Sequence, residues 1–507
     1  MIVDSSRGPC GALGTLALLG LLSLVLPSRL AGQATPARLP ERGDTVATVV
    51  RNPEGVPQDS ATRAARDSVR ARRNRPRPLL AVAEGLAVNV FLQRMNGSLR
   101  HADWADISWR SWANNIRYGW EWDVDQFQTN MFGHPYGGGF YFNAGRDNGL
   151  SFWGSVPLTF LGSATWEYFG ENLRPSLNDL YMTAFGGIVF GEIGHRVGGM
   201  LRDNRATGVD RVLREVAAIP FDPVGGFNRI VRGEFLAVTA DPDDRDRSPF
   251  SLDLQAGARL AIDSGPARQR SLAGTVLADI SYGDAFAQGF RQPFDVFRAR
   301  IQVSPAHGGL NTARMTGRLY GRELTDTTAR VRHVATIALK SEYLSGLAYK
   351  FGGQSLEAGF VSDFQTTAHM HVQTEAYAEW VLLGGLDAPG AGVRERTYDF
   401  GPGVGLNAAA ALQVGARSVL SVRWRSVRLH TVSGSKGDHR THFFSLETSL
   451  PLGRSLGVGG YAGWYYQRSY YGAGLGAQLS YPELRAFLTW HGGRGLVSRQ
   501  AAGGAGL

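Results

Sequence analysis

The amino-acid sequence predicts a mixed fold, in which an N-terminal α-helical module precedes an antiparallel transmembrane β-barrel of about twelve strands. Three observations indicate it. The apolar period changes from about 3.6 to about 2 near Ser248, the alternating segments run about 10 to 14 residues, and the N-terminus is of the export type. The only cysteine, Cys10, lies ahead of the apolar core of that N-terminus. The exported chain therefore has no thiol for a disulfide or a cysteine metal site.

Residues 1–34 have the pattern of a cleaved secretory signal, with Arg7 before an apolar stretch and small residues at Ala31 and Ala34. Residues 35–78 are rich in Pro, Arg, Asp, Ala and Thr without an apolar period, so we expect a disordered linker. The formal net charge of +9 does not indicate nucleic acid, because an exported protein seldom meets it. The basic stretch 63–78 is either a solvated linker or is attracted to anionic lipid or lipopolysaccharide.

Residues 79–247 are predicted to form the helical module. LLAVAEGLAVNVFLQRM, from Leu79, is apolar with the length of a helix, and the next segment places several tryptophans in a helix-like mixture. SFWGSVPLTFLGSATWEYF, Ser151 to Phe169, carries no charge until Glu167. Pro157 and the hydroxyl side chains in this stretch favour a helix buried against other protein over a lone membrane span.

Residues 248–492 are predicted to form the barrel, and residues 493–507 a flexible tail. In FSLDLQAGARLAID, from Phe250, every even-numbered position is apolar and most odd-numbered positions are polar, and HVQTEAYAEW and ARMTGRLYGR alternate in the same way. A soluble sheet with one buried face would also alternate, but the segment length and the export signal favour lipid outside and a polar lumen. The apolar phase reverses within SVRWRSVRLH, and we expect a β-bulge near Ser426 there.

The polar face of the predicted barrel is rich in charge. It would point arginines and acids into the lumen: Arg259, Arg298, Arg300, Arg314, Arg318, Arg423, Arg425 and Arg485, beside Asp253, Asp279, Glu375, Glu379 and Glu447. These groups either pair across the lumen and fill it or form a selective anion path. Aromatic residues near segment ends are expected to form interfacial girdles: Tyr461, Trp464, Tyr465, Tyr466, Tyr470, Tyr471 and Trp490.

Four sequence blocks in the helical module carry a resemblance to a known family. They are GHPYGGGFYFNAGRDNGLSFW, WEYFGE, PSLNDL and GGIVFGE, with a core from Gly133 to Glu192. Together they resemble an uncharacterised bacterial envelope family, domain of unknown function 3943. The resemblance implies an exported, outer-membrane protein and supplies no reaction. At the level of pattern alone, small membrane-associated helical proteins of the teicoplanin-resistance type are similar in the order Asp125, His134, Glu167, Asp179, Gly186.

The candidate catalytic residues are His134, Glu167, Glu171 and Asp179. Glu167 and Glu171 are four apart on a helix and share a face, so their pKa values could split to suit acid and base roles, or the pair could hold a divalent cation. His134 could act as a base if Asp125 or Asp147 oriented it, although no nucleophile is recognisable.

The competing interpretation of these residues is structural. The two glutamates would lie at a solvated helix end, and Asp179 would complete a capping motif that begins at Ser176. Both interpretations predict a helix boundary between Glu171 and Ser176. Only the catalytic interpretation predicts that the candidate side chains converge in space.

Further residues of the same blocks are binding candidates: Tyr136, Arg146, Trp166, Asn178 and Glu192. Asn178 is expected to reach outward and Glu192 to pair with Arg196, and the glycines at 186, 187, 191 and 194 should allow close helix packing. No zinc-protease, serine-hydrolase, dinucleotide-binding or haem motif is present. The sequence therefore indicates no metal and leaves any cofactor unknown.

The predicted function is that of an outer-membrane barrel whose helical module lies at the periplasmic mouth or plugs the lumen, in envelope structure, docking or small-solute passage. The alternative is an outer-membrane enzyme that acts on lipid or lipopolysaccharide through the His, Glu and Asp residues of the module. A soluble two-domain periplasmic binding protein is a third interpretation. Outer-membrane lipid or lipopolysaccharide is the expected partner, nucleic acid is not, and whether the protein is an enzyme is left open.

Overall fold

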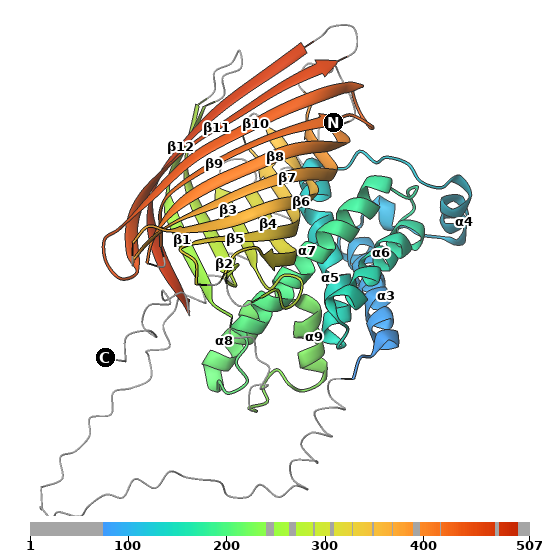
Figure 1. Cartoon of the computed structure of the whole chain (residues 1–507). Coiled ribbons are helices and arrows are strands. Elements are labelled where there is room, and N and C mark those ends of the chain that lie inside the picture. The colour runs from blue at the N-terminus through green and yellow to red at the C-terminus, as the bar shows by residue number, and fades with distance from the viewer. Residues whose placement is uncertain are drawn as a thin grey trace, which may run out of the picture.

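The computed structural model describes residues 75–239, 248–262, 270–286, 289–304, 309–326, 328–346, 349–367, 369–388, 396–415, 417–471 and 476–494. Helices come first in this part of the chain and strands follow (Figure 1). The helices are α3 (Pro78–Arg94), α4 (Trp109–Tyr118), α5 (His134–Asp147), α6 (Phe152–Phe169), α7 (Leu177–Leu201), α8 (Gly208–Ala218) and α9 (Pro223–Val231). The predicted signal peptide and almost all of the predicted linker and tail lie outside the described residues.

The strands form a closed antiparallel barrel, in which each strand pairs with its neighbours in sequence and β1 also pairs with β12. They are β1 (Phe250–Ile262), β2 (Arg270–Tyr282), β3 (Phe297–Ser304), β4 (Gly309–Glu323), β5 (Val331–Ser345), β6 (Lys350–Gln365), β7 (Met370–Asp387), β8 (Tyr398–Val414), β9 (Arg417–His430), β10 (Gly437–Pro451), β11 (Leu456–Tyr471) and β12 (Gly476–Arg494). Helices followed by a twelve-stranded barrel confirm the predicted fold class.

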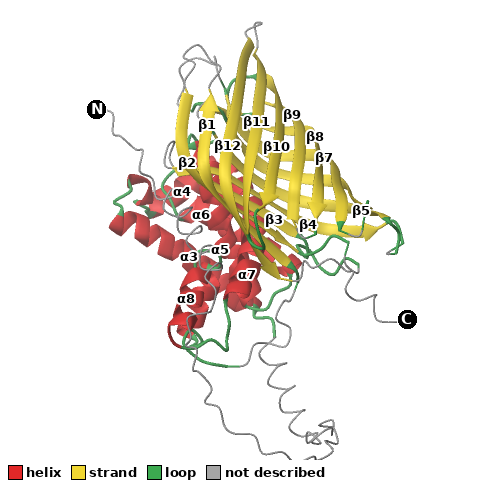
Figure 2. Ribbon diagram, turned by 90° about the vertical axis from the view of Figure 1, so that its left-hand side faces the viewer, coloured by secondary structure: helices red, strands yellow, loops and turns green. Residues whose placement is uncertain are grey.

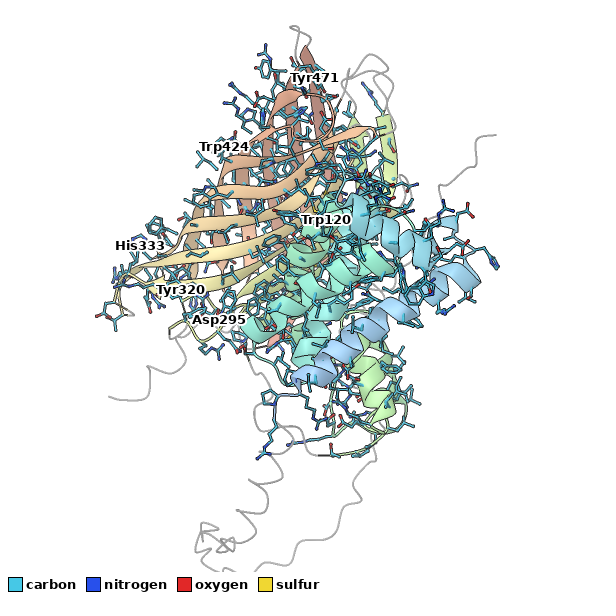
Figure 3. The ribbon with its side chains drawn as sticks, turned by 90° about the vertical axis from the view of Figure 1, so that its right-hand side faces the viewer. Trp120, Asp295, Tyr320, His333, Trp424 and Tyr471 are labelled. Atoms are coloured by element: carbon cyan, nitrogen blue, oxygen red, sulfur yellow. The ribbon has the colours of Figure 1, made fainter. Side chains whose placement is uncertain are left out.

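The two faces of the barrel wall are fixed by contacts between distant strands. Glu447 of β10 bonds to Gln255 of β1 and to Arg300 of β3, and side chains so far apart around the wall meet only across the lumen. The opposite phase of the strands therefore faces outward. Trp424, seen on the barrel in Figure 3, is 40% exposed in this phase. It belongs to an apolar outer belt with Leu272, Val404, Leu406, Phe444, Leu446, Trp464, Leu484 and Leu488.

The lumen is filled by paired charges along part of its length. The predicted inward arginines form ion pairs with acids there: Arg259 with Glu483, Arg298 and Arg300 with Asp279, Arg314 with Glu342, Arg318 with Asp295, Arg423 with Glu375, and Arg425 with Glu342 and Glu379. Buried charges are tolerated when each one has a partner of opposite sign. This arrangement matches the pairing alternative for the lumen.

Apolar side chains close one end of the lumen, and they correct two predictions. β9 pairs without a register shift around Ser426, so the expected bulge is wrong. Val427 and Leu429 reverse the apolar phase because the lumen itself is apolar there, where both join a buried cluster with Tyr349 and Tyr465. Tyr465 is 3% exposed and stacks on Tyr349, and Tyr461 lies under Arg485, so these two tyrosines face the lumen and do not join a girdle.

The helical module packs against the outside of the barrel, beside the strands (Figures 1 and 2). Ile280, Ala299 and Ile301 belong to the outward phase, and they share one apolar core with Phe132 and Phe190 of the module. The predicted place for the module, at the mouth of the barrel or inside it, is therefore wrong. The apolar outer face of the first strands, which would contact lipid in an isolated barrel, is the surface that the helices bury.

Close contact between α5 and α7 depends on glycine. A Cβ atom on Gly138 would overlap the main-chain oxygen of Thr183 and lie 2.9 Å from Cα of Gly187, and one on Gly186 would overlap Pro135. The predicted role of the α7 glycines in helix packing is thus seen in the backbone contacts. None of the helices in the described residues is both long and apolar enough to cross a membrane.

Candidate functional site

Side chains from four parts of the module meet near the start of α7. We call Asp123, Asp125, His134, Glu167, Glu171 and Asp179 the His134 cluster. Asp123 and Asp125 lie on the segment before α5, and His134 begins α5. Glu167 lies in the last turn of α6, Glu171 follows that helix, and Asp179 lies in the first turn of α7. The four candidate catalytic residues therefore lie in one region of the module, around the start of α7.

One ring nitrogen of His134 faces two carboxyl groups. Its Nε2 atom is 3.3 Å from Oδ1 of Asp179 and 4.0 Å from Oδ2 of Asp125. Asp125 is the partner proposed from the sequence, whereas Asp147, the other candidate, faces His195. The side chain of Asp125 is 52% exposed and that of His134 is 20% exposed, so the cluster is open to its surroundings on this side.

Glu167 is buried and holds the turn between α6 and α7. Its Oε2 atom accepts a hydrogen bond of 2.8 Å from the main-chain N–H of Ser176, and its carboxyl group also bonds to that of Glu171. Two carboxyl groups can share a hydrogen bond only if one of them carries a proton. The solvated helix end expected in the structural interpretation is wrong, because Glu167 is 1% exposed.

The capping prediction for Asp179 is half right. Ser176 is the N-cap of α7, and its hydroxyl accepts from the main-chain N–H of Asp179. The reciprocal bond to the N–H of Ser176 comes from Glu167, which frees the carboxylate of Asp179 to face His134. Asn178 does not reach outward as expected. It is fully buried and donates to Asp123 at 2.5 Å and to Asp179 at 2.8 Å.

Burial without compensation shifts the protonation equilibria of the cluster. Burial raises the pKa of Glu167 to about 8, despite the bond from Ser176. Burial and the neighbouring acids raise the pKa values of Glu171 and Asp179 well above those of free carboxyls. Burial lowers the pKa of His134, which favours the neutral imidazole. Burial thus favours the neutral imidazole of His134 and the protonated forms of the neighbouring acids.

Several buried acids elsewhere in the described part of the module are paired with arginine, and those of this cluster are not. Glu192 bonds to Arg146 and Arg196, Glu215 to Arg229, and Asp222 to Arg202. No arginine or lysine among the described residues forms an ion pair with Asp125, Glu167, Glu171 or Asp179. An uncompensated group of buried acids is costly, and such groups are concentrated at functional sites.

The barrel holds the cluster in place through β8. The hydroxyl of Tyr398 donates to the main-chain oxygen of Asp125 and accepts from Asn130, both at 2.6 Å. Arg396 donates to the main-chain oxygen of Asp123 at 2.6 Å. The segment that carries the two aspartates is therefore fixed to the outer wall of the barrel.

The other binding candidates lie away from the cluster, except Asn178. Glu192 sits between Arg146 and Arg196, so the predicted pair with Arg196 is present and Arg146 joins it as a helix-to-helix link. Tyr136 lines an apolar cavity of about 50 Å³ between the module and the barrel wall, and its hydroxyl donates to Pro220. Trp166 meets the ring of Trp104 edge to face.

Asp123, Asn130 and Tyr398 are the residues at the cluster that the sequence interpretation missed. Asp123 lies two residues before Asp125, and this spacing in WEWDVDQF was the one available signal. Tyr398 is more than two hundred residues away in the barrel, where nothing in the local sequence marks it.

The fold and its surfaces define the class of protein. A closed antiparallel barrel with an apolar outer belt and a charged lumen is the architecture of bacterial outer-membrane proteins, so this chain is an outer-membrane β-barrel protein with a helical module on its wall. Residues 119–224 match the family described as Domain of unknown function (DUF3943). This match contains the entire His134 cluster and confirms the resemblance inferred from the sequence blocks.

Comparisons with other proteins give distant matches. No curated protein matches the chain. The NanC porin is 11% identical with a TM-score of 0.24, and the match covers 47% of this chain and 98% of that one. The CymD monoaromatic hydrocarbon channel is 11% identical with a TM-score of 0.20, and the match covers 48% of this chain and 88% of that one. The Pseudomonas putida toluene transporter TodX is 8% identical with a TM-score of 0.19, and the match covers 50% of this chain and 90% of that one. The assignment to the outer membrane depends on the closed barrel and its apolar belt.

Proposed function

We propose that this protein is an outer-membrane enzyme that hydrolyses an ester or phosphoester bond of a membrane lipid or lipopolysaccharide, with the barrel as its anchor. The observation that carries the proposal is a group of neighbouring acids without an arginine or lysine partner among the described residues, two of which, Asp179 and Asp125, face His134. Acid–base catalysis needs a base and an acid with pKa values near the working pH, held in one place. Burial raises the pKa of Glu167 to about 8 and lowers that of His134, so an acid and an unprotonated imidazole are available in the same part of the module.

The roles follow from protonation state and contacts. Asp179 and Asp125 face Nε2 of His134 and orient the imidazole, which takes a proton from water at Nδ1 as the water oxygen attacks the ester. Glu167 or Glu171 gives a proton to the departing oxygen, so the proton count balances and no cofactor is consumed. The product acid and alcohol leave, and proton exchange with solvent through the exposed side of Asp125 restores the cluster.

The position of the cluster favours a lipid substrate. The module rests on the apolar outer wall of the barrel, and its own surface exposes apolar side chains such as Leu79, Phe91, Trp153 and Phe227. Exposed apolar groups of this size suit a membrane environment. Passage of solutes has less support, because ion pairs and an apolar cluster occupy the lumen.

Lipid conversion by the purified protein tests the proposal. The full chain would be placed in liposomes made from outer-membrane lipid and lipopolysaccharide, and products followed by mass spectrometry. We expect a hydrolysis product with the wild type and at least roughly a hundredfold slower formation with His134→Ala or Asp179→Asn. Glu121→Gln is the matched control, because this acid lies near the cluster but pairs with Arg174 at the surface.

Two outcomes would contradict the enzyme. One is the absence of any product from the wild type, and the other is equal product from wild type and both cluster variants. Ion conductance in planar bilayers would separate the alternative function. We expect no steady conductance, and a stable open pore that survives His134→Ala would instead favour passage of small solutes.

A further inference from the structure

A second group of side chains lies at the other end of α7, where no function has been assigned. Asp147 ends α5, His195 lies in α7, and Asp222 is the N-cap of α9. One ligand atom from each lies within 4.8 Å of the other two. With 1.5 Å of rise per residue, His195 is about 24 Å along α7 from Asp179, so this group is separate from the His134 cluster.

The distances suit a common metal ion. Nδ1 of His195 is 3.3 Å from Oδ1 of Asp147 and 4.0 Å from Oδ2 of Asp222. Oxygen and nitrogen ligands about 2.1 Å from a tetrahedral zinc ion lie roughly 3.4 Å apart. The two separations from His195 are close to that value, and the separation between the two carboxylates is at most 4.8 Å.

An unsatisfied oxygen points into the same place. The side chain of Asp147 is only 10% exposed, and its Oδ2 atom is buried without a hydrogen-bond partner. A Cβ atom on Gly225 would overlap Oδ2 of Asp222 and lie 2.8 Å from Oδ2 of Asp147, so both oxygens converge above this glycine. Buried acceptors without donors are rare in native proteins, and an absent ion is one of their recognised causes.

Hydrogen bonds from neighbouring residues fix the position of the Asp222 carboxylate. Asp222 accepts from the N–H of Gly225 and from Arg202, which also bonds to the main-chain oxygen of Asp222. Arg202 pairs with one of the two carboxylates, that of Asp222, and leaves the carboxyl group of Asp147 facing His195.

We propose that Asp147, His195 and Asp222 bind one divalent transition-metal ion, with zinc as the leading candidate. One imidazole and two carboxylates suit zinc better than calcium or magnesium, which take oxygen ligands alone. The three ligands come from α5, α7 and α9, so the ion fastens α9 to the pair of helices that packs on the barrel. Three protein ligands leave a coordination position for water or an anionic group.

Metal binding by the full chain tests this site. The protein, purified in detergent without a histidine tag and stripped with a chelator, would be titrated with Zn²⁺ alone against a chromogenic chelator. We expect one equivalent for the wild type and at least roughly tenfold weaker binding for His195→Ala and Asp147→Asn. Bound Zn²⁺ should also raise the thermal midpoint of module unfolding in the wild type but not in these variants.

The controls separate this site from others. His430→Ala removes an exposed histidine that pairs with Asp438 on the barrel and should bind as the wild type does. His134→Ala should also keep the metal while it loses lipid conversion, so failure of the proposed enzyme leaves this test intact. A wild type that takes up no Zn²⁺, or a His195→Ala variant with normal affinity and a normal heat-modifiable band, would overturn the site.

Discussion

The lumen of the barrel and the His134 cluster bury acids in opposite ways. In the lumen Glu379 bonds to Arg425 at 2.6 Å and to Lys340 at 2.7 Å, and Glu342 contacts Arg314 and Arg425. In the cluster Glu167, Glu171 and Asp179 face one another, and His134 is the basic side chain among them. Paired charges stabilise a structure, whereas acids without partners are kept at the expense of stability and indicate function.

The largest effect is expected in the lumen. Glu379→Gln removes the charge that Arg425 and Lys340 share, so the free energy of unfolding should fall by about 3 to 5 kcal/mol. The urea dependence of the heat-modifiable gel band measures it. Glu375→Gln is the matched control, because Glu375 is 37% exposed and its loss should cost about 1 kcal/mol or less. Equal stability of the two variants would break the comparison.

A smaller loss of stability is expected from a substitution in the module, and it should not affect the barrel. Gly138→Ala forces a methyl group onto the backbone of Thr183 and Gly187 and should destabilise the module by about 1 to 3 kcal/mol. Gly137→Ala is the control, since no atom lies within 4 Å of its added Cβ and the helix should gain up to about 1 kcal/mol. Tryptophan fluorescence during urea unfolding reports the module. A barrel that loses its heat-modifiable band in Gly138→Ala would show that the two parts do not unfold separately.

The stability of the module should depend on pH through the protonation of Glu167. The pKa of this carboxyl rises from 4.5 to about 8 on folding, because burial disfavours the charged form. The folded state therefore holds the proton more tightly. The contribution of Glu167 to the free energy of unfolding is fully present below about pH 4.5. It is lost as pH rises to about 8, by at most about 1.4 kcal/mol per pH unit.

Glu167→Gln separates this behaviour from that of the lumen. The amide is neutral at every pH and can still accept from Ser176, so the variant should be more stable than the wild type at pH 8 and depend less on pH. Unfolding curves at pH 5 and pH 8 measure the difference. A destabilised amide variant with an unchanged pH slope would place Glu167 with the structural acids of the lumen.

The smallest effect belongs to an exposed pair. Arg174 bonds to Glu121 at 2.7 Å, with side chains 43% and 39% exposed, so Arg174→Ala should cost only about 0.5 kcal/mol. The same fluorescence measurement applies. A loss above about 2 kcal/mol would mean that the turn after α6 depends on this arginine as the lumen depends on its own.

The barrel was predictable because a period of two is a local property of each strand. The alternation in β1 assigns Asp253 and Arg259 to the lumen and Leu252 and Leu260 to the outside without knowledge of any partner. The same rule failed at Val427 and Leu429, since it assumes a polar lumen along the whole strand. The position of the module was not predictable either, because an apolar outer face of a barrel can contact either lipid or packed helices.

The cluster was predictable in part. His134, Glu167, Glu171 and Asp179 stand out as polar groups beside apolar helices, and Asp125 as an acid at a suitable distance. Their grouping depends on the tight turn between α6 and α7. There the main-chain N–H of Ser176 donates to Glu167, whereas a local capping rule predicts that it donates to Asp179. His195 and Asp222 carried no motif, since Asp147, His195 and Asp222 meet only after three helices pack.

The attachment of the module to the outer wall affects the order of assembly. The module precedes every strand in the chain, so its helices are synthesised before the wall made by Ile280, Ala299 and Ile301. Until then the side of the helices that carries Phe132 and Phe190 has nothing to cover it. Part of the circumference of the finished barrel is therefore covered by the protein's own helices, and only the remainder of the apolar wall is left to contact lipid.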